Sequence, residues 1–329
     1  MNWYLQSGKE SDVVVSSRIR LARNIIEYPF ETRCSKKENE EIVNKIKEVL
    51  PSIGYGLKIL NLKDMDDITK MSLVEKRLVS PDFVMNKNDI GAIAINEEDH
   101  LRLQVFAPGF EIEELLKLMV EIDTKFGKTL NYAYNDKYGY LTACPTNVGT
   151  GMRVSVMVHL PALTKTGNIQ KVLHIINNFG MNIRGIYGEG SKAAGDMYQI
   201  SNKQTLGVSE EEIINNMKII VEKIIEQERL ARKYLAKHSI ELEDKVYRSF
   251  GIISNCKKIS SEEAREILSD VKLGTDLGII KELDDLKVKK LYLYTKPANL
   301  QKYLGEVNDN YERDIKRAEV IKNIIKENN

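Results

Sequence analysis

The chain has few cysteines and almost no net charge. Its three cysteines, Cys34, Cys144 and Cys256, lie far apart and include no CxxC pair. This pattern argues against a disulfide framework and against zinc ligation, and it fits a reducing cytoplasm. The 49 basic and 48 acidic side chains leave a formal net charge of +1. No bulk electrostatic attraction to nucleic acid or to an anionic membrane is therefore expected.

Long apolar runs and the common phosphate-binding glycine motifs are missing as well. No stretch approaches the roughly 20 apolar residues that cross a bilayer, and the first residues lack the apolar core of a signal peptide. The segment GIYGEG (185–190) has neither the order GxGxxG nor a following Lys-Ser/Thr pair, which argues against a dinucleotide fold and against a P-loop. The 329 residues, 42% of them apolar, predict a soluble globular protein with one large domain and a smaller one.

Hydrophobic periodicity predicts a mixture of strands and helices. Ser209 and Glu212 have the spacing of a capping box at the start of the longest predicted helix. After residue 239 only short helical segments are expected. We therefore predict an α+β fold with one domain over 1–238 and a small, mostly helical domain over 239–329. Alternation with a period of two indicates strands over 12–20, within 90–106, over 152–160 and over 181–189, and a period of 3.6 indicates helices over 36–50, 65–79, 111–125, 168–178 and 209–237.

Two of the predicted strands carry pairs of basic residues. Arg18 and Arg20 are two positions apart, and so are His100 and Arg102, so each pair shares a strand face. Adjacent arginines repel each other unless an anion lies between them, although a solvated edge strand is the alternative for Arg18 and Arg20. Glu98 belongs to an acidic turn that leads directly into the second basic strand. A solvated hairpin tip is the alternative for that turn.

The segment 140–163 combines a cysteine, a turn and a strand. Pro145 disfavours helical backbone at Cys144 and so holds this residue extended. The Thr, Asn and Gly residues that follow supply turn chemistry and unblocked backbone N–H groups. Alternation after Gly151 places Arg153 on the polar face of the strand. This arrangement predicts a loop that holds a thiol and an anion near one strand.

Five separated blocks resemble the phosphagen, or guanidino, kinases: SSRIR (16–20), NEEDHLR (96–102), CPTNVGT (144–150), Arg153 and RGIYGE (184–189). The similarity continues through IELEDKVYRSFGIISNC, SDVKLGTDLGII and RDIKRA, which narrows it to the bacterial protein arginine kinases and covers nearly the whole chain. The resemblance implies a guanidino-kinase catalytic domain, with a central antiparallel sheet flanked by helices. It also implies transfer of phosphate from ATP to arginine side chains of proteins.

The resemblance assigns roles to individual residues. Glu98 and Glu189 would grip the guanidinium and the Cys144 thiolate would contact it. Glu98 would be the general base, because a proton must leave a group whose pKa exceeds roughly 12. Mg²⁺ is implied as a cofactor beside ATP, held chiefly by phosphates and water without a protein ligand. The ATP phosphates would be held by Arg18, Arg20, Arg102, Arg153 and Arg184. The nucleotide site would further include Ser16, Ser17, Ile19, Arg77, Val154, Ser155, Val156, Met157, Gly185, Ile186, Tyr187 and Gly188.

In the predicted helical domain, Arg313, Asp314 and Arg317 match the phosphoarginine-binding RDxxRA motif of the family. Their spacing allows arginine to hold phosphate and the acid to hold guanidinium, whereas a solvated charged helix face is the alternative. Arg77 stands where the family commonly has a histidine. The resemblance further implies a homodimer, a zinc-containing activator protein, a heat-shock repressor as substrate and a Clp-type unfoldase and protease that receives marked proteins. These partners would belong to a stress response under allosteric control.

Two other functions stay open. Small-guanidine kinases of this family carry a helical amino-terminal domain of roughly 100 residues, a normal domain size. Here the arginine strand starts close to the first residue, so we expect a site that admits arginine within a protein. A kinase of free arginine or of another small guanidine is the first alternative. A phosphoarginine-binding adaptor with little catalysis is the second.

Overall fold

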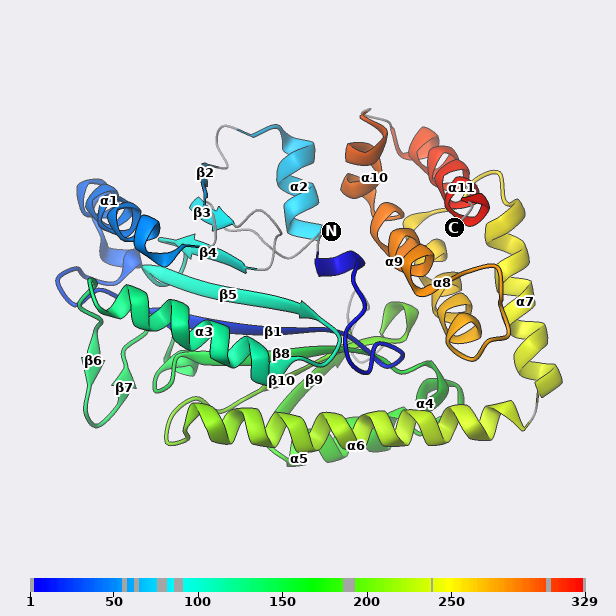
Figure 1. The fold of residues 1–329 in the computed structure, drawn as a ribbon, viewed down its shortest axis with the longest axis horizontal. Coiled ribbons are helices and arrows are strands. Elements are labelled where there is room, and N and C mark those ends of the chain that lie inside the picture. Colours follow the sequence, from blue (N-terminus) through cyan, green and yellow to red (C-terminus); the bar gives the residue numbers. More distant parts are fainter. Residues whose placement is uncertain are drawn as a thin grey trace.

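An antiparallel β-sheet runs through the middle of the larger part of the molecule (Figure 1). The computed structural model describes residues 3–54, 58–61, 65–75, 82–85, 91–185, 193–237, 239–305 and 309–327. Within them, eight strands pair antiparallel in the spatial order β2-β3-β4-β5-β1-β8-β10-β9. Their bounds are β1 (Val14–Arg23), β2 (Lys58–Asn61), β3 (Asp82–Met85), β4 (Gly91–Ile95), β5 (Leu101–Pro108), β8 (Met152–His159), β9 (Met181–Gly185) and β10 (Met197–Asn202).

One face of this sheet is apolar and buried. Ile19 and Leu21 point to it from β1, and Val154 and Val156 extend it on β8. The helices α1 (Lys36–Ile53), α3 (Ile112–Gly127) and α6 (Glu210–Ala236) contribute their apolar stripes to the same core. Burial at roughly 25 cal/mol per Å² of apolar surface fixes the register of the strands. The alternate residues of each strand must then point to the opposite face.

Side-chain caps define where several helices begin. Ser209 Oγ accepts a hydrogen bond from Glu212 N, and the Glu212 carboxylate accepts one from Ser209 N, so the predicted capping box is confirmed. Ser35 and Glu38 make the same reciprocal pair at the start of α1. The predicted helix over 168–178 is confirmed as α5 (Ile169–Asn178). The described part of the predicted helix over 65–79 is α2 (Asp67–Glu75).

Residues after 239 are helical and have an apolar core of their own, which Figure 1 shows beside the sheet. The sheet with its flanking helices and this helical region confirm the predicted α+β fold. Leu235, near the end of α6, packs against both apolar cores. The helices are α7 (Ser239–Asn255), α8 (Ser261–Asp276), α9 (Asp285–Tyr294), α10 (Pro297–Leu304) and α11 (Asn310–Lys326).

Two segments join the sheet to the helical region. The 3₁₀ helix η1 (Trp3–Leu5) lies between β5 and α9 (Figure 1). On α2, the Glu75 carboxylate accepts hydrogen bonds from Ala298 N (2.8 Å) and Asn299 N (2.9 Å). These are unpaired donors of the first turn of α10, so Glu75 caps a helix from outside it. The amino-terminal segment and α2 therefore both contact the helical region.

Some elements were not predicted. They include the strands β2, β3 and β10, the short helix α4 (Pro161–Lys165), and the separate helices α9 and α10. The strand predicted over 12–20 is observed as β1, which begins two residues later at Val14 and ends three residues later at Arg23. In the part of the chain that the structure describes, no helix combines the length and apolar character needed to cross a membrane.

Candidate active site

Five arginines from four strands share the face of the sheet opposite the core. Arg20 on β1 lies opposite Arg153 on β8, and Arg102 on β5 lies opposite Ala22, two residues further along β1. Because residues directly opposite each other in a sheet point to the same face, Arg18, Arg20, Arg102 and Arg153 converge. The same face reaches Arg184 through the register Ser16↔Met157, Met157↔Gln199 and Gln199↔Arg184. The structure therefore brings together all five of the predicted phosphate-binding arginines.

Arg20 is the centre of this positive cluster. Burial and then repulsion by Arg102, Arg153 and Arg184 lower the pKa of the Arg20 guanidinium to about 10. Arg102 is paired with an acidic residue, since its Nη1 lies 2.6 Å from Glu97 Oε2. Yet Arg20 Nε and Arg102 Nε are buried and have no hydrogen-bond partner among the described residues. Since buried polar groups are normally paired, these nitrogens indicate a site for an anion with several oxygen atoms.

The acidic turn and the cysteine loop lie next to each other at one end of this face. Asp99 is buried, and its Oδ1 accepts a hydrogen bond from Ala143 N at 2.7 Å. Glu98 precedes Asp99 and is exposed, whereas Cys144 follows Ala143 and is half-buried. The Cys144 Sγ lies 3.1 Å from Thr146 Oγ1. One short hydrogen bond thus ties together the two backbone segments that carry Glu98 and Cys144.

Asn24, just beyond β1, organises both of these segments. Its Nδ2 donates to Asp99 Oδ1 at 2.6 Å and to Leu141 O at 3.1 Å. Its Oδ1 accepts from His100 N at 2.9 Å. Sequence reasoning missed Asn24, although a polar residue that follows a strand of buried residues was a usable signal.

Arg23 holds the far end of the cysteine loop and was also missed. Its Nη1 donates to Thr150 O at 3.0 Å, and its Nη2 pairs with Asp123 Oδ2 at 2.8 Å. The guanidinium lies 3.5 Å from the centre of the Tyr140 ring. Arg23 is an odd-numbered strand residue and therefore points to the core face, away from Arg18 and Arg20. The sequence signal for Arg23 was a charged residue at a strand position where the alternation calls for an apolar one.

His100 does not join the arginine face. β5 begins at Leu101, and His100 lies buried in the preceding bend. Its Nδ1 accepts a hydrogen bond from Ile25 N, and its Nε2 donates to Pro29 O at 2.8 Å. Burial lowers the pKa of the imidazole, so the ring stays neutral as these contacts require. The expectation that His100 extends the basic strand face therefore fails, because the turn redirects its side chain.

The remaining strand residues of the predicted nucleotide site divide between the two faces. Ser16, Ser155 and Met157 line a cavity of about 190 Å³ that adjoins the arginine cluster, and Arg18 lines it too. Arg18 Nε donates to Ser155 Oγ at 3.2 Å. Gly185 is the last residue of β9. The side chains on the core face are Ser17, Ile19, Val154 and Val156. The residues outside the described part of the chain are Arg77, Ile186, Tyr187, Gly188 and Glu189.

The RDxxRA residues of α11 have unequal environments. Arg317 is buried, and it donates from Nε to Thr295 O (2.7 Å), from Nη1 to Ile259 O (2.8 Å), and to Asp314. The assignment of Arg313, Asp314 and Arg317 to phosphoarginine binding stays a prediction, and the two arginines differ in their surroundings. Arg317 joins α11 to neighbouring segments through backbone carbonyls. Arg313 is half-buried, and its Nε has no hydrogen-bond partner among the described residues.

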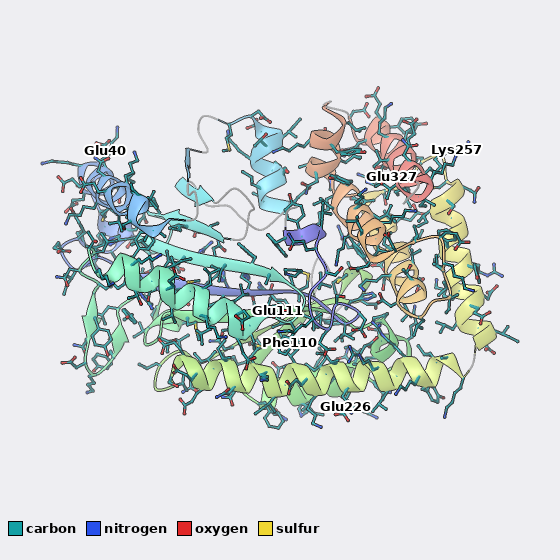
Figure 2. All side chains as sticks on the ribbon, viewed as in Figure 1. Glu40, Phe110, Glu111, Glu226, Lys257 and Glu327 are labelled. Atoms are coloured by element: carbon teal, nitrogen blue, oxygen red, sulfur yellow. The ribbon has the colours of Figure 1, made fainter. Side chains whose placement is uncertain are left out.

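A larger groove of about 690 Å³ lies away from this face, between the start of α3 and the middle of α6. Figure 2 shows Phe110, Glu111 and Glu226, which line it. None of the five sheet arginines lines this groove. Its charged residues largely neutralise each other, since Lys9 Nζ lies 3.0 Å from Glu111 Oε2. The arginine-bearing face is therefore the stronger candidate for a reaction site.

Comparison with known proteins identifies the family of the chain. Residues 38–231 match the family model of the ATP:guanido phosphotransferase C-terminal catalytic domain, and residues 239–329 match that of the protein-arginine kinase McsB C-terminal domain. The chain is 47% identical over 332 residues to a protein-arginine kinase of Halothermothrix orenii, covering 98% of this chain and 95% of that protein. It is 45% identical over 340 residues to a protein-arginine kinase of Geobacillus sp. (strain WCH70), covering 99% and 94%.

A solved structure has a similar fold. It is the substrate-free duplicated taurocyamine kinase from Schistosoma mansoni, which is 26% identical to this chain with a TM-score of 0.61. The match covers 70% of this chain and 36% of the taurocyamine kinase, so this chain spans little more than a third of that protein.

Proposed function

The chain belongs to the protein-arginine kinases of the ATP:guanido phosphotransferase family and is a phosphotransferase, and from this we propose that it phosphorylates arginine side chains within proteins. The observation that carries the proposal is Arg20, which is buried among three other arginines while its Nε has no partner among the described residues. Burying several like charges together lowers the free energy of unfolding unless a polyanion binds them. The phosphates of ATP, the phosphoryl donor of this family, supply that polyanion.

On the phosphate side, the arginines act by position and charge. The transferred phosphoryl group passes through a loose transition state whose charge is spread over its oxygens, so fixed cationic donors stabilise it more than they stabilise bound ATP. Arg20, Arg102 and Arg153 hold the phosphates above the sheet, and Arg18 and Arg184 flank them. Mg²⁺ would be bound through phosphate oxygens and water and would neutralise part of their charge.

On the guanidinium side, Glu98 and Cys144 orient the arginine of the substrate. A guanidinium nitrogen forms the new N–P bond to the γ-phosphorus, and the bond from that phosphorus to the β,γ-bridging oxygen breaks, releasing ADP. The proton lost by the nitrogen goes to the Glu98 carboxylate. Glu189 is a second carboxylate for the guanidinium fork. The Cys144 sulfur contacts the same group without forming a bond to it.

The geometry of β1 gives the two substrates a linear order. Ser16 lines the cavity, Arg18 and Arg20 follow, and Asn24 organises the segments that carry Glu98 and Cys144. A strand rises roughly 3.3 Å per residue. ATP therefore lies along the strand with its γ-phosphate toward the guanidinium site.

The region 239–329 would form a second domain that binds phosphoarginine and supports a homodimer, while 1–238 would be the catalytic domain. Support comes from its match to the C-terminal domain of protein-arginine kinases and from its separate apolar core. Arg313 supplies a nitrogen for the phosphate and Asp314 an oxygen for the guanidinium. In this proposal the enzyme acts in the cytoplasm during stress, with a zinc-containing activator, a heat-shock repressor as substrate and a Clp-type protease that receives the marked proteins.

Substrate class is tested by comparing two phosphoryl acceptors. The purified chain is incubated with γ-labelled ATP and either a reduced, alkylated protein or free arginine, and turnover is measured on each. Faster acid-labile labelling of the protein supports the proposal, with Glu98→Gln as the matched inactive control. Faster turnover of free arginine would favour a small-guanidine kinase. Binding of phosphoarginine-bearing protein without transfer to either acceptor would favour an adaptor.

A further inference from the structure

A short hairpin projects from the end of the sheet near the cysteine loop. Its strands are β6 (Tyr134–Asn135) and β7 (Gly139–Tyr140), and Figure 1 shows them beyond the end of the main sheet. A groove of about 980 Å³ runs between this hairpin, the end of α3 and the segment that leads into α6. Ligand sites in proteins have volumes of roughly 300 to 1,000 Å³. The hairpin groove therefore has room for several side chains of a ligand.

The hairpin and the cysteine loop are joined through their backbones. Tyr140 N donates to Gly149 O at 2.8 Å, and Gly149 N donates to Tyr140 O at 3.2 Å. Gly139 approaches the loop so closely that a Cβ atom there would lie 2.6 Å from Gly149 O. Gly149 itself lines the groove. One end of the loop therefore carries Cys144, and the other end forms a wall of the groove.

The base of the hairpin is tied to the acidic turn as well. Ala133 N donates to Asn24 O at 2.8 Å, and Leu141 N donates to Ala133 O at 2.8 Å. The side chain of Asn24 donates to Asp99, the residue after Glu98. The groove thus has a fixed position relative to both of the segments that form the guanidinium side of the proposed active site.

The groove presents exposed aromatic side chains on a rigid base. The Arg23 guanidinium lies 3.5 Å from the centre of the Tyr140 ring, and Tyr134 packs edge-on against Tyr140 with 5.2 Å between ring centres. Tyr134 and Tyr138 nevertheless remain 52% and 46% exposed, and Leu206, from the segment before α6, is 46% exposed. Tyrosines supply a large contact area at a low cost in conformational entropy, and binding surfaces are rich in them. The groove is therefore suited to apolar side chains of a partner.

We propose that this groove binds the part of the protein substrate that flanks the target arginine, and that Tyr134 and Tyr138 contact apolar side chains of that segment. The inference rests on the proposed function, because the arginine itself must reach Glu98 and Cys144. The bound segment is unfolded and extended, since the apolar side chains of a folded protein are mostly buried.

The length of chain between the groove and the thiol sets the spacing in the substrate. Tyr140 and Cys144 are four residues apart, which limits the separation of their Cα atoms to about 14 Å. An extended substrate covers this distance with about four residues, at roughly 3.3 Å each. The apolar side chain therefore lies within about four positions of the target arginine. None of the five sheet arginines lines the groove, so occupation of the groove leaves the phosphate side untouched.

The test compares two synthetic peptides of equal length, each with a single central arginine. One peptide has leucine about four positions before and after the arginine, and the other has serine there. Tyr134→Ser and Tyr138→Ser should each raise the KM of the leucine peptide about tenfold and leave its kcat and the KM for ATP unchanged. Turnover of the serine peptide and of N-acetyl-arginine amide should not change, because neither offers an apolar side chain to the groove.

Two further variants serve as controls. Tyr138→Phe keeps the aromatic ring and should keep the KM of the unmodified chain. Tyr234→Ser changes a similarly exposed tyrosine of α6 that does not line the groove, and it should have no effect on the KM of the leucine peptide. Equal KM values for this peptide in Tyr134→Ser, Tyr138→Ser and the unmodified chain would overturn the proposal.

Other results would assign the hairpin a different role. An equal loss of turnover with N-acetyl-arginine amide would overturn the proposal, because the hairpin would then act only by positioning the cysteine loop. A changed sedimentation coefficient with an unchanged KM would also overturn it, since the groove would then bind a second copy of the chain. Phosphorylation of free arginine but of neither peptide would overturn the proposed function itself.

Discussion

The Asp99 carboxylate accepts a 2.7 Å hydrogen bond from the backbone nitrogen of Ala143. Through this contact, the residue after Glu98 holds the residue before Cys144. Asn24 completes the arrangement by donating to the same Asp99 oxygen at 2.6 Å. The relative position of a general base and a thiol is thus determined by buried groups that need not touch either substrate.

Asn24→Ala should lower kcat on the order of 100-fold with little change in ATP affinity. The variant removes the hydrogen bonds to Asp99, His100 N and Leu141 O, so the separation of Glu98 and Cys144 is no longer fixed. A displacement of a catalytic group by about 1 Å lowers the rate by about this factor. Steady-state kinetics with calorimetric ADP binding separates the two effects. Asp136→Asn, at an exposed turn, is the control. A loss of ADP affinity as large as the loss of kcat would contradict this role.

Cys144→Ala should reduce turnover about 10- to 100-fold and leave ADP binding intact, because the thiolate is assigned to the guanidinium side. Single-turnover rates and ADP titration measure the two quantities independently. Cys256→Ala, in the helical region, is the matched cysteine control. Abolished ADP binding in Cys144→Ala would show that this residue belongs to the phosphate side instead.

Arg20→Met should abolish most activity and yet stabilise the nucleotide-free protein. Burial and the neighbouring arginines lower the pKa of the Arg20 guanidinium to about 10, so its charged form opposes folding until an anion binds. We expect a stability gain of about 1 to 3 kcal/mol without nucleotide, and a loss of kcat of about 100- to 1000-fold. Thermal unfolding with and without ADP checks both claims.

The control for that experiment is Arg248→Met, on an exposed part of α7. ADP should raise the melting temperature of this control as it does for the unmodified chain, since a ligand that binds only the folded state stabilises it by mass action. An ADP-induced shift in Arg20→Met as large as that of the control would contradict the phosphate assignment.

The two arginines of the RDxxRA motif should respond differently to substitution. Arg317→Ala leaves Thr295 O, Ile259 O and Asp314 without their partner, so a loss of about 3 to 5 kcal/mol in unfolding free energy is expected. Arg313→Ala should cost less than about 1 kcal/mol and abolish phosphoarginine binding. Denaturant unfolding and phosphoarginine calorimetry distinguish them. Equal destabilisation by the two variants would contradict this division.

Stability should fall as pH drops below about 6.5, because burial lowers the pKa values of His100 and His159 in the folded protein. Below that pH the unfolded chain binds more protons than the folded one. Each of these two histidines therefore lowers the free energy of unfolding by about 1.4 kcal/mol for each pH unit below about 6.5. Unfolding between pH 7 and 5 measures the slope. His174→Gln, at an exposed position, should leave it unchanged, whereas His100→Gln should reduce it.

The sequence was sufficient for the features that depend on local pattern. Alternation placed Arg18 and Arg20 on one strand face, and the capping box at Ser209 located the start of α6. The register then adds what alternation cannot supply, namely that Arg20 lies opposite Arg153. Strand pairing joins residues more than a hundred positions apart, and no local signal specifies the partner.

The features that sequence reasoning missed depend on contacts across the fold. Asn24 acts through Asp99 and Leu141, and Arg317 reaches Thr295, so neither role is visible in its own segment. His100 fits the alternation of β5 but lies in the bend before it, where burial and two hydrogen bonds determine its direction. Tertiary packing decides such positions, and a motif shows only that the residue is present.

The most direct test of the central claim is mass spectrometry, under non-acidic conditions, of an unfolded protein treated with the purified chain and ATP. We predict an added phosphoryl group on arginine residues of that protein, lost on brief acid treatment and absent with Glu98→Gln. Phosphate found only on serine, threonine or tyrosine, or an unmodified protein beside phosphorylated free arginine, would contradict the account.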